Sequence, residues 1–155
     1  MDEDVLEEIR YYERERDNAR ARRDDLNAEI DELNRKHKKN KELTDQYNKL
    51  LSKINLTQIE LIKSEKDKTN ALNNLKKNFV GVASQKITKQ YNTAFQNLQS
   101  VKKNLVTCKI EANSKLKKLS AEKKNIEKQL SDKKDERNRK NNLIDYYNRK
   151  LNSLY

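Results

Sequence analysis

Apolar side chains recur every seven residues through the first half of the chain. Ten of the twelve positions at this interval between Val5 and Val82 are apolar. A companion line, four residues further on, runs from Ile9 to Phe79, and about half of its positions are apolar. Alternating steps of three and four residues are typical of the seam along which coiled-coil helices pack. The pattern therefore predicts one long helix over about residues 3–79.

The second half carries its own line at the same interval. Eight of the ten positions from Tyr91 to Leu154 are apolar, which predicts a second long helix over about residues 85–154. The companion line comprises Ile87, Ala94, Val101 and Cys108, and then the positions from Leu116 to Leu151. Between Cys108 and Leu116 the spacing runs 4–4 instead of 3–4, which predicts a stutter in the seam.

The two lines are out of phase where they meet. The second line starts nine residues after Val82, so a continuous helix would rotate its apolar face by about 200°. The only glycine of the chain, Gly81, lies at this phase break. Gly81 is suited to cap the first helix in the left-handed conformation, and Ser84 to cap the second. We predict a turn over about residues 79–84; the alternative is a continuous helix in which Gly81 costs about 1 kcal/mol.

The charge distribution favours an antiparallel arrangement of the two helices. Residues 1–32 contain thirteen acidic and six basic side chains, net −7, whereas residues 115–150 contain six acidic and thirteen basic side chains, net +7. A turn at Gly81 places these opposite charges side by side, and their sum can select an orientation although each exposed pair contributes little. We therefore predict an all-α fold: residues 1–155 form a single long antiparallel two-helix coiled-coil hairpin.

Composition excludes several classes of fold and of function. Apolar residues make up 33% of the chain, with one glycine and no proline, which excludes repeated β-hairpins and a thick globular core. His37 and Cys108 are the only residues of their types, so we expect no enzyme, no cofactor and no metal site. We interpret His37 as structural and Cys108 as a small side chain packed in the seam.

The sequence also predicts where the protein is found. No stretch approaches eighteen apolar residues, so no transmembrane helix is expected. The acidic start, Met1-Asp2-Glu3-Asp4, lacks the apolar segment of a Sec-type signal peptide. These features predict a cytoplasmic protein.

The open end of the hairpin is the predicted site of partner binding. Like charges lie at similar heights there, unless Asp17, Asp24, Asp25 or Asp145 intercept them. Two tyrosine doublets fall within about two helical turns of each other, suited either to end packing or to a partner surface. Nearer the turn, His37, Asn40 and Thr44 come level with Lys123 and are interpreted as setting the register. The candidate partner-binding residues are Tyr11, Tyr12, Arg16, Arg23, Arg137, Lys140, Tyr146 and Tyr147.

The tripeptide Phe79-Val80-Gly81 between two long helices resembles the turn of the WXG family of small type VII secretion proteins. The long arms look more like the YwqH-like and LXG-toxin-associated helical proteins of Gram-positive bacteria. By this resemblance Phe79 takes the tryptophan role and Gly81 the glycine role. The resemblance implies a targeting chaperone that binds the helical N-terminal domain of a larger secreted effector or toxin. The export signal Tyr-x-x-x-Asp/Glu is absent after the second helix, so a partner would supply it, and type VII export of this chain is an alternative to a cytoplasmic location.

Two other interpretations remain open. Residues 33–114 contain seventeen basic and six acidic side chains, net +11, a surface that attracts phosphate backbones and predicts a nucleic-acid-associated coiled coil. The other is a generic coiled-coil spacer. An isolated two-helix hairpin has a thin core, so we expect association with a second helical protein or with another copy of the chain.

Overall fold

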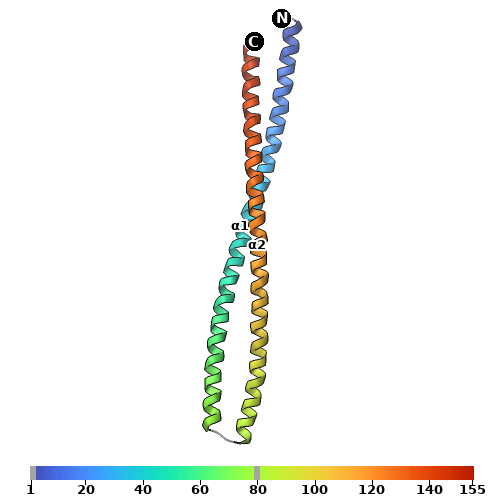
Figure 1. The fold of residues 1–155 in the computed structure, drawn as a ribbon. Helices are drawn as coiled ribbons and strands as arrows, with labels where there is room; N and C mark the ends of the chain where they lie inside the picture. Colours follow the sequence, from blue (N-terminus) through green and yellow to red (C-terminus); the bar gives the residue numbers. More distant parts are fainter. Residues whose placement is uncertain (1–2, 79–80) are drawn as a thin grey trace. The chain divides into compact units, whose positions relative to one another are not determined.

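The computed structural model describes residues 3–78 and 81–155, and nearly all of them are helical. Helix α1 (Glu3–Asn78) and helix α2 (Val82–Leu154) pack against each other, and no strand occurs in the described residues. Figure 1 traces α1 from blue to green and α2 from yellow-green to red. The predicted all-α helical hairpin with a turn near Gly81 is confirmed.

The charges at the ends of α1 suit the dipole of a helix. Glu3 and Asp4 lie in its first turn, and Lys76 and Lys77 lie in its last. Acidic groups near the start and basic groups near the end each stabilise a helix by about 0.3–1 kcal/mol. The chain has no proline to interrupt either helix.

The turn depends on the conformation of Gly81. Its φ is +130°, a value that L side chains rarely adopt. Its carbonyl oxygen accepts a hydrogen bond from the amide of Gln85 at 3.2 Å, so Gly81 stands at the N-cap position of α2. The prediction that Ser84 caps this helix is wrong, because α2 begins at Val82 and Ser84 lies in its first turn. The other two residues of the turn tripeptide, Phe79 and Val80, lie outside the described part of the chain.

The two helices together build two units. Unit 1 pairs Met1–Glu42 of the chain with Ser120–Tyr155, and unit 2 consists of Leu43–Leu119. Nine apolar side chains are buried in the described residues of unit 1. They are Ile9, Ala19, Leu26, Ile30, Leu33, Ile126, Leu130, Ile144 and Leu151. Leu26 is fully enclosed, which makes unit 1 the better packed of the two.

Unit 2 buries much less apolar surface. Only four apolar side chains are buried in its described residues: Ile54, Leu72, Ala112 and Leu119. Nine large apolar side chains are instead exposed there. They are Leu50, Leu56, Ile59, Ile62, Val82, Ile87, Val101, Val106 and Ile110.

The seam of α1 follows both predicted lines. Every described position of the companion line from Ile9 to Leu72 is buried or partly buried. The main line is likewise buried or partly buried from Val5 to Leu75, with Lys68 as the exception. The last residue predicted for this line, Val82, is exposed because it begins α2.

The seam of α2 corrects the sequence prediction. Its main line from Tyr91 to Leu154 is buried or partly buried throughout, as expected. The predicted companions are exposed, and their places are taken by the residues that follow them; they are Ile87, Ala94, Val101 and Cys108. The observed companion line is Thr88, Phe95, Lys102, Lys109 and Leu116. Steps of three and four residues therefore continue without the predicted stutter, and Cys108 is not a packed seam residue.

Candidate interaction surfaces

Four tyrosine rings form a continuous contact near the start of α1 and the end of α2. The rings of Tyr12 and Tyr147, one from each helix, have centroids 6.2 Å apart. Tyr11 meets Tyr12 edge-on at 5.5 Å, and Tyr146 meets Tyr147 in the same way at 5.4 Å. We call these four residues the tyrosine cluster. Edge-to-face ring pairs at such distances are favourable beyond the apolar area that they bury.

The inner and outer members of the tyrosine cluster differ in exposure. Tyr12 and Tyr147 are partly buried between the helices, whereas Tyr11 is 49% exposed and Tyr146 43% exposed. Each outer ring has a cation above it at 5.9 Å, Arg14 over Tyr11 and Lys150 over Tyr146. The inner pair therefore closes the seam, and the outer pair is available to a partner.

The environment raises the pKa of both inner phenols. A hydrogen bond to Glu8, with burial, raises the pKa of Tyr12 above its ordinary value of 10.0. Burial raises the pKa of Tyr147, and the carboxylate of Glu15 adds to the effect. A raised pKa favours the protonated phenol in the folded state, so its contribution to stability is complete below pH 10 and is lost above the folded pKa.

The predicted basic members of the site lie on the seam lines rather than on the outer surface. Arg16, Arg23, Arg137 and Lys140 are all partly buried. Arg16 donates to Asp17 at 3.2 Å and Arg23 donates to Asp24 at 2.9 Å, so two of the four aspartates named as possible partners bind these cations. The Nε atom of Arg137 is buried and has no hydrogen-bond partner in the described residues.

An ionic network that the sequence reasoning missed ties the helices of unit 1 together. Arg22 donates through Nε to Glu136 at 2.9 Å on α2 and through Nη1 to Glu29 at 3.1 Å on its own helix. Glu29 also pairs with Lys133 of α2 at 2.5 Å. The hydrogen bond from Lys133 is the main cause of a lowered pKa of Glu29, and the bond to Glu136 raises the pKa of Arg22.

Polar residues interrupt the seam of unit 1 at one level. Asn40 is buried, 3% exposed, and donates to Glu122 of α2 at 3.2 Å. His37 lies 3.5 Å from Glu127, an ion-pair distance for a protonated imidazole but without hydrogen-bond geometry. Lys123, expected level with these residues, pairs with Glu127 of its own helix at 3.7 Å. A buried asparagine with a cross-helix partner is the kind of residue that fixes the register of a coiled coil.

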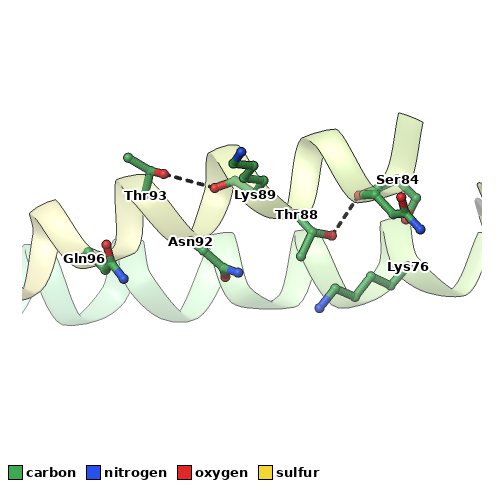
Figure 2. Close-up of a pocket in the computed structure, with 8 residues that line it drawn as sticks. Lys76, Ser84, Thr88, Lys89, Asn92, Thr93 and Gln96 are labelled. Carbon is green, nitrogen blue, oxygen red and sulfur yellow. Dashed lines mark hydrogen bonds between the residues drawn. The ribbon is translucent and has the colours of Figure 1, made fainter. Parts of the chain in front are cut away.

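A polar hollow lies beside the turn of unit 2. It is lined by Lys76 of α1 and by residues of α2 between Ser84 and Gln96 (Figure 2). Thr88 and Thr93 each donate to a backbone carbonyl one helical turn earlier, at 2.8 and 3.2 Å. These hydroxyls are engaged with their own helix, and the lining residues include no carboxylate, thiol or imidazole.

Two kinds of feature are absent from the described residues. No helix contains a stretch long and apolar enough to cross a membrane. No group of three or more histidine, cysteine, aspartate or glutamate side chains is arranged to hold a metal ion.

Comparisons with protein-family models, with curated proteins and with solved structures found no match to this chain. The resemblance to the WXG family and to LXG-toxin-associated helical proteins therefore stays a prediction from the turn tripeptide and the helical arms.

Proposed function

We propose that this protein is a non-catalytic helical interaction protein that binds a helical region of another protein through the tyrosine cluster. The observation that supports the proposal is the difference in exposure between the inner and outer tyrosines of the cluster. Tyr12 and Tyr147 hold the helices together, whereas Tyr11 and Tyr146 each keep nearly half of their surface exposed. Tyrosine supplies apolar area and a hydroxyl group with little loss of side-chain entropy, which is why it is frequent in binding surfaces.

The more specific proposal is that the protein acts as a partner or targeting chaperone in type VII secretion. Its support is the resemblance of Phe79-Val80-Gly81 to the WXG turn, together with the helical hairpin and the positive φ of Gly81. In this role the chain binds the helical N-terminal domain of a larger effector or toxin and presents it to the secretion machinery. In this proposal the partner carries the export signal of the complex.

Affinity purification from the native host tests the proposal. We expect a stoichiometric companion with a long helical region, retained after nuclease treatment and identified by mass spectrometry. The variant Tyr11→Ala/Tyr146→Ala should reduce its recovery at least about tenfold, because interface tyrosines often contribute more than 1 kcal/mol each. Tyr155→Ala removes a tyrosine that lies outside the cluster and is 79% exposed, and it serves as the control. Recovery of the companion by the double variant at the level of the wild type would contradict the proposal.

A second candidate function is nucleic-acid binding. Arg35, Lys36, Lys38, Lys39 and Lys41 are all exposed within seven residues of α1. Binding to DNA or RNA should then fall steeply as salt rises, because it depends on release of counterions from phosphates. No retention on either polymer at low salt would remove this candidate, and the absence of any companion as well would favour a structural spacer.

A further inference from the structure

Four of the exposed apolar side chains of unit 2 gather on one side of the helix pair. Ile62 of α1 and Val106 of α2 line a common groove together with Gln58 and Lys102. Ile59 lies three residues before Ile62, and Ile110 lies four residues after Val106, so each follows its neighbour along the same face of its own helix. We call Ile59, Ile62, Val106 and Ile110 the apolar face.

The side chains of the apolar face are about half exposed or more. Ile59, Ile62 and Ile110 are 60–64% exposed, and Val106 is 48% exposed. Single exposed apolar residues are common, but large apolar side chains grouped around a groove usually mark an interaction site. The core of unit 2 is also thin, with only four buried apolar side chains among its described residues. A third helix laid on this face would give unit 2 the buried area that its two helices lack.

The charges around the apolar face identify the chemistry of that helix. Lys63 and Lys66 each follow a face residue of α1 by four positions, and Lys103 precedes Val106 by three, so all three flank the face. All three are exposed and make no ion pair in the described part of the chain. The one carboxylate one turn from Ile62, Glu65, is already bonded to Lys102 and Gln99. Unit 2 as a whole has fifteen lysines and five acidic residues, net +10.

A second copy of the chain does not fit these charges. A symmetric dimer would set the apolar face against itself and bring its lysines together with the same lysines of the other copy. Unit 1 offers no acidic surplus in compensation, because its twenty-one basic and twenty acidic residues nearly cancel. The occupant must bring its own negative charge.

We infer that the apolar face of unit 2 docks an amphipathic α-helix whose apolar stripe is flanked by aspartate or glutamate. The spacing supports a helix as the occupant, since ridges at intervals of three and four residues accept the side chains of another helix. This contact lies in a different unit from the tyrosine cluster, and it adds a second, chemically specified partner surface beyond the proposed function.

Synthetic helices test the inference directly. The probe is a fluorescent peptide of about four heptads with a leucine and isoleucine stripe flanked by glutamates. One control peptide replaces the glutamates with lysines, and another keeps the glutamates but replaces the apolar stripe with glutamine. Fluorescence anisotropy with the full chain should show the acidic amphipathic peptide binding at least about tenfold more tightly than either control. Equal binding of the acidic and basic helices, or of the peptide without a stripe, would overturn the inference.

Variants of the chain locate the binding. Ile62→Gln/Val106→Gln should weaken binding at least about tenfold, since it removes two apolar contacts. Val101→Gln is the matched control, because Val101 is similarly exposed on α2 but lies five residues from Val106 and points about 140° away. Lys63→Glu/Lys66→Glu/Lys103→Glu should reverse the preference, so that the basic peptide binds better. Unchanged affinity in both multiple variants, with circular dichroism showing intact helices, would contradict the inference.

Other occupants would produce different results. A wild-type dimer that dissociates in Ile62→Gln/Val106→Gln would show that a second copy covers the face. Displacement of the peptide by an oligonucleotide would show that the lysines bind a nucleic acid. Either result overturns the inference. The variant Tyr11→Ala/Tyr146→Ala should bind the peptide normally, so failure of the tyrosine-mediated function and failure of this inference are distinguishable.

Discussion

At the scale of single residues, Glu29 connects α1 to α2 through Lys133 and also holds Arg22. The hydrogen bond from Lys133 lowers the pKa of Glu29 below its ordinary value of 4.5 in the folded state. Its stabilising effect is therefore present above about pH 4.5 and is lost as the pH falls through the folded pKa. Glu29→Gln should lower stability at neutral pH and flatten the loss of stability between neutral and acidic pH.

Urea unfolding followed by circular dichroism from pH 7 to pH 3 measures this effect of Glu29. Asp31→Asn is the control, because Asp31 is exposed and has no ion pair in the described residues. The control should keep the acid-dependent loss of the wild type. An unchanged pH profile for Glu29→Gln would show that the bridge to Lys133 does not contribute to stability.

Gly81 illustrates a residue whose role lies in the backbone rather than in its contacts. An added Cβ would meet nothing within 4 Å, so any cost of substitution comes from the φ of +130°. Gly81→Ala should lower the free energy of unfolding by about 1 kcal/mol or more. Gly81→Asn should cost as much, because asparagine tolerates the left-handed helical region near +57° but not this one. Wild-type stability of the asparagine variant in urea unfolding would contradict the conformation described for the turn.

At the scale of elements, the register of α2 shows how far the sequence can predict the seam. The main lines of both helices follow from their seven-residue repeat, and the phase break at Gly81 predicts the hairpin. The companion line of α2 was not predictable in the same way, because apolar Val101 and Cys108 stand one residue before the true seam positions. The repeat that includes Leu98 and Leu105 continues unbroken and determines the register, so Val101 and Cys108 stay outside the seam. Lys102 fits in the seam because Glu65 of α1 binds its ammonium group.

Lysine substitutions test this register. Val101→Lys should change the free energy of unfolding by less than about 0.5 kcal/mol, because the new charge stays in solvent. Leu105→Lys, four residues later in the partly buried seam, should lower it by about 2 kcal/mol or more. Chemical denaturation followed by circular dichroism measures both. Equal losses would restore the predicted register in which Val101 packs between the helices.

Only part of the candidate site could be predicted from the sequence. The meeting of Tyr12 with Tyr147 follows from counting equal distances on either side of the turn. The pairing of Glu29 with Lys133 obeys the same count, but the sequence analysis did not single out these two residues. The difference in exposure between the inner and outer tyrosines depends on which face of each helix points at the other helix. The seven-residue repeat does not determine this face where two companion lines are possible. For the same reason the apolar face of unit 2 was not predicted, since Val106 becomes exposed only once Lys102 and Leu105 define the seam.

At the scale of the whole molecule, the two units divide the net charge very unequally. Unit 1 carries a net charge of +1, whereas unit 2 carries a net charge of +10. The described residues of unit 1 form several ion pairs between the helices, whereas those of unit 2 form one, between Glu65 and Lys102. Salt screens both attraction and repulsion, and the Debye length falls from about 30 Å at 0.01 M to about 10 Å at 0.1 M. Screening should therefore weaken the attractions within unit 1 and relieve the repulsion among the lysines of unit 2.

Hydrogen exchange resolved along the chain should show this opposite response to salt. Between about 10 and 150 mM sodium chloride, we expect amide protection to rise in unit 2 and to fall or stay constant in unit 1. Choline chloride at the same ionic strengths is the control, because a screening effect does not depend on the cation. Lys63→Gln/Lys66→Gln/Lys103→Gln should reduce the salt response of unit 2, since it removes three like charges from one side of the helix pair. A parallel rise in both units would show that general salt effects, rather than the unequal charge, govern their stability.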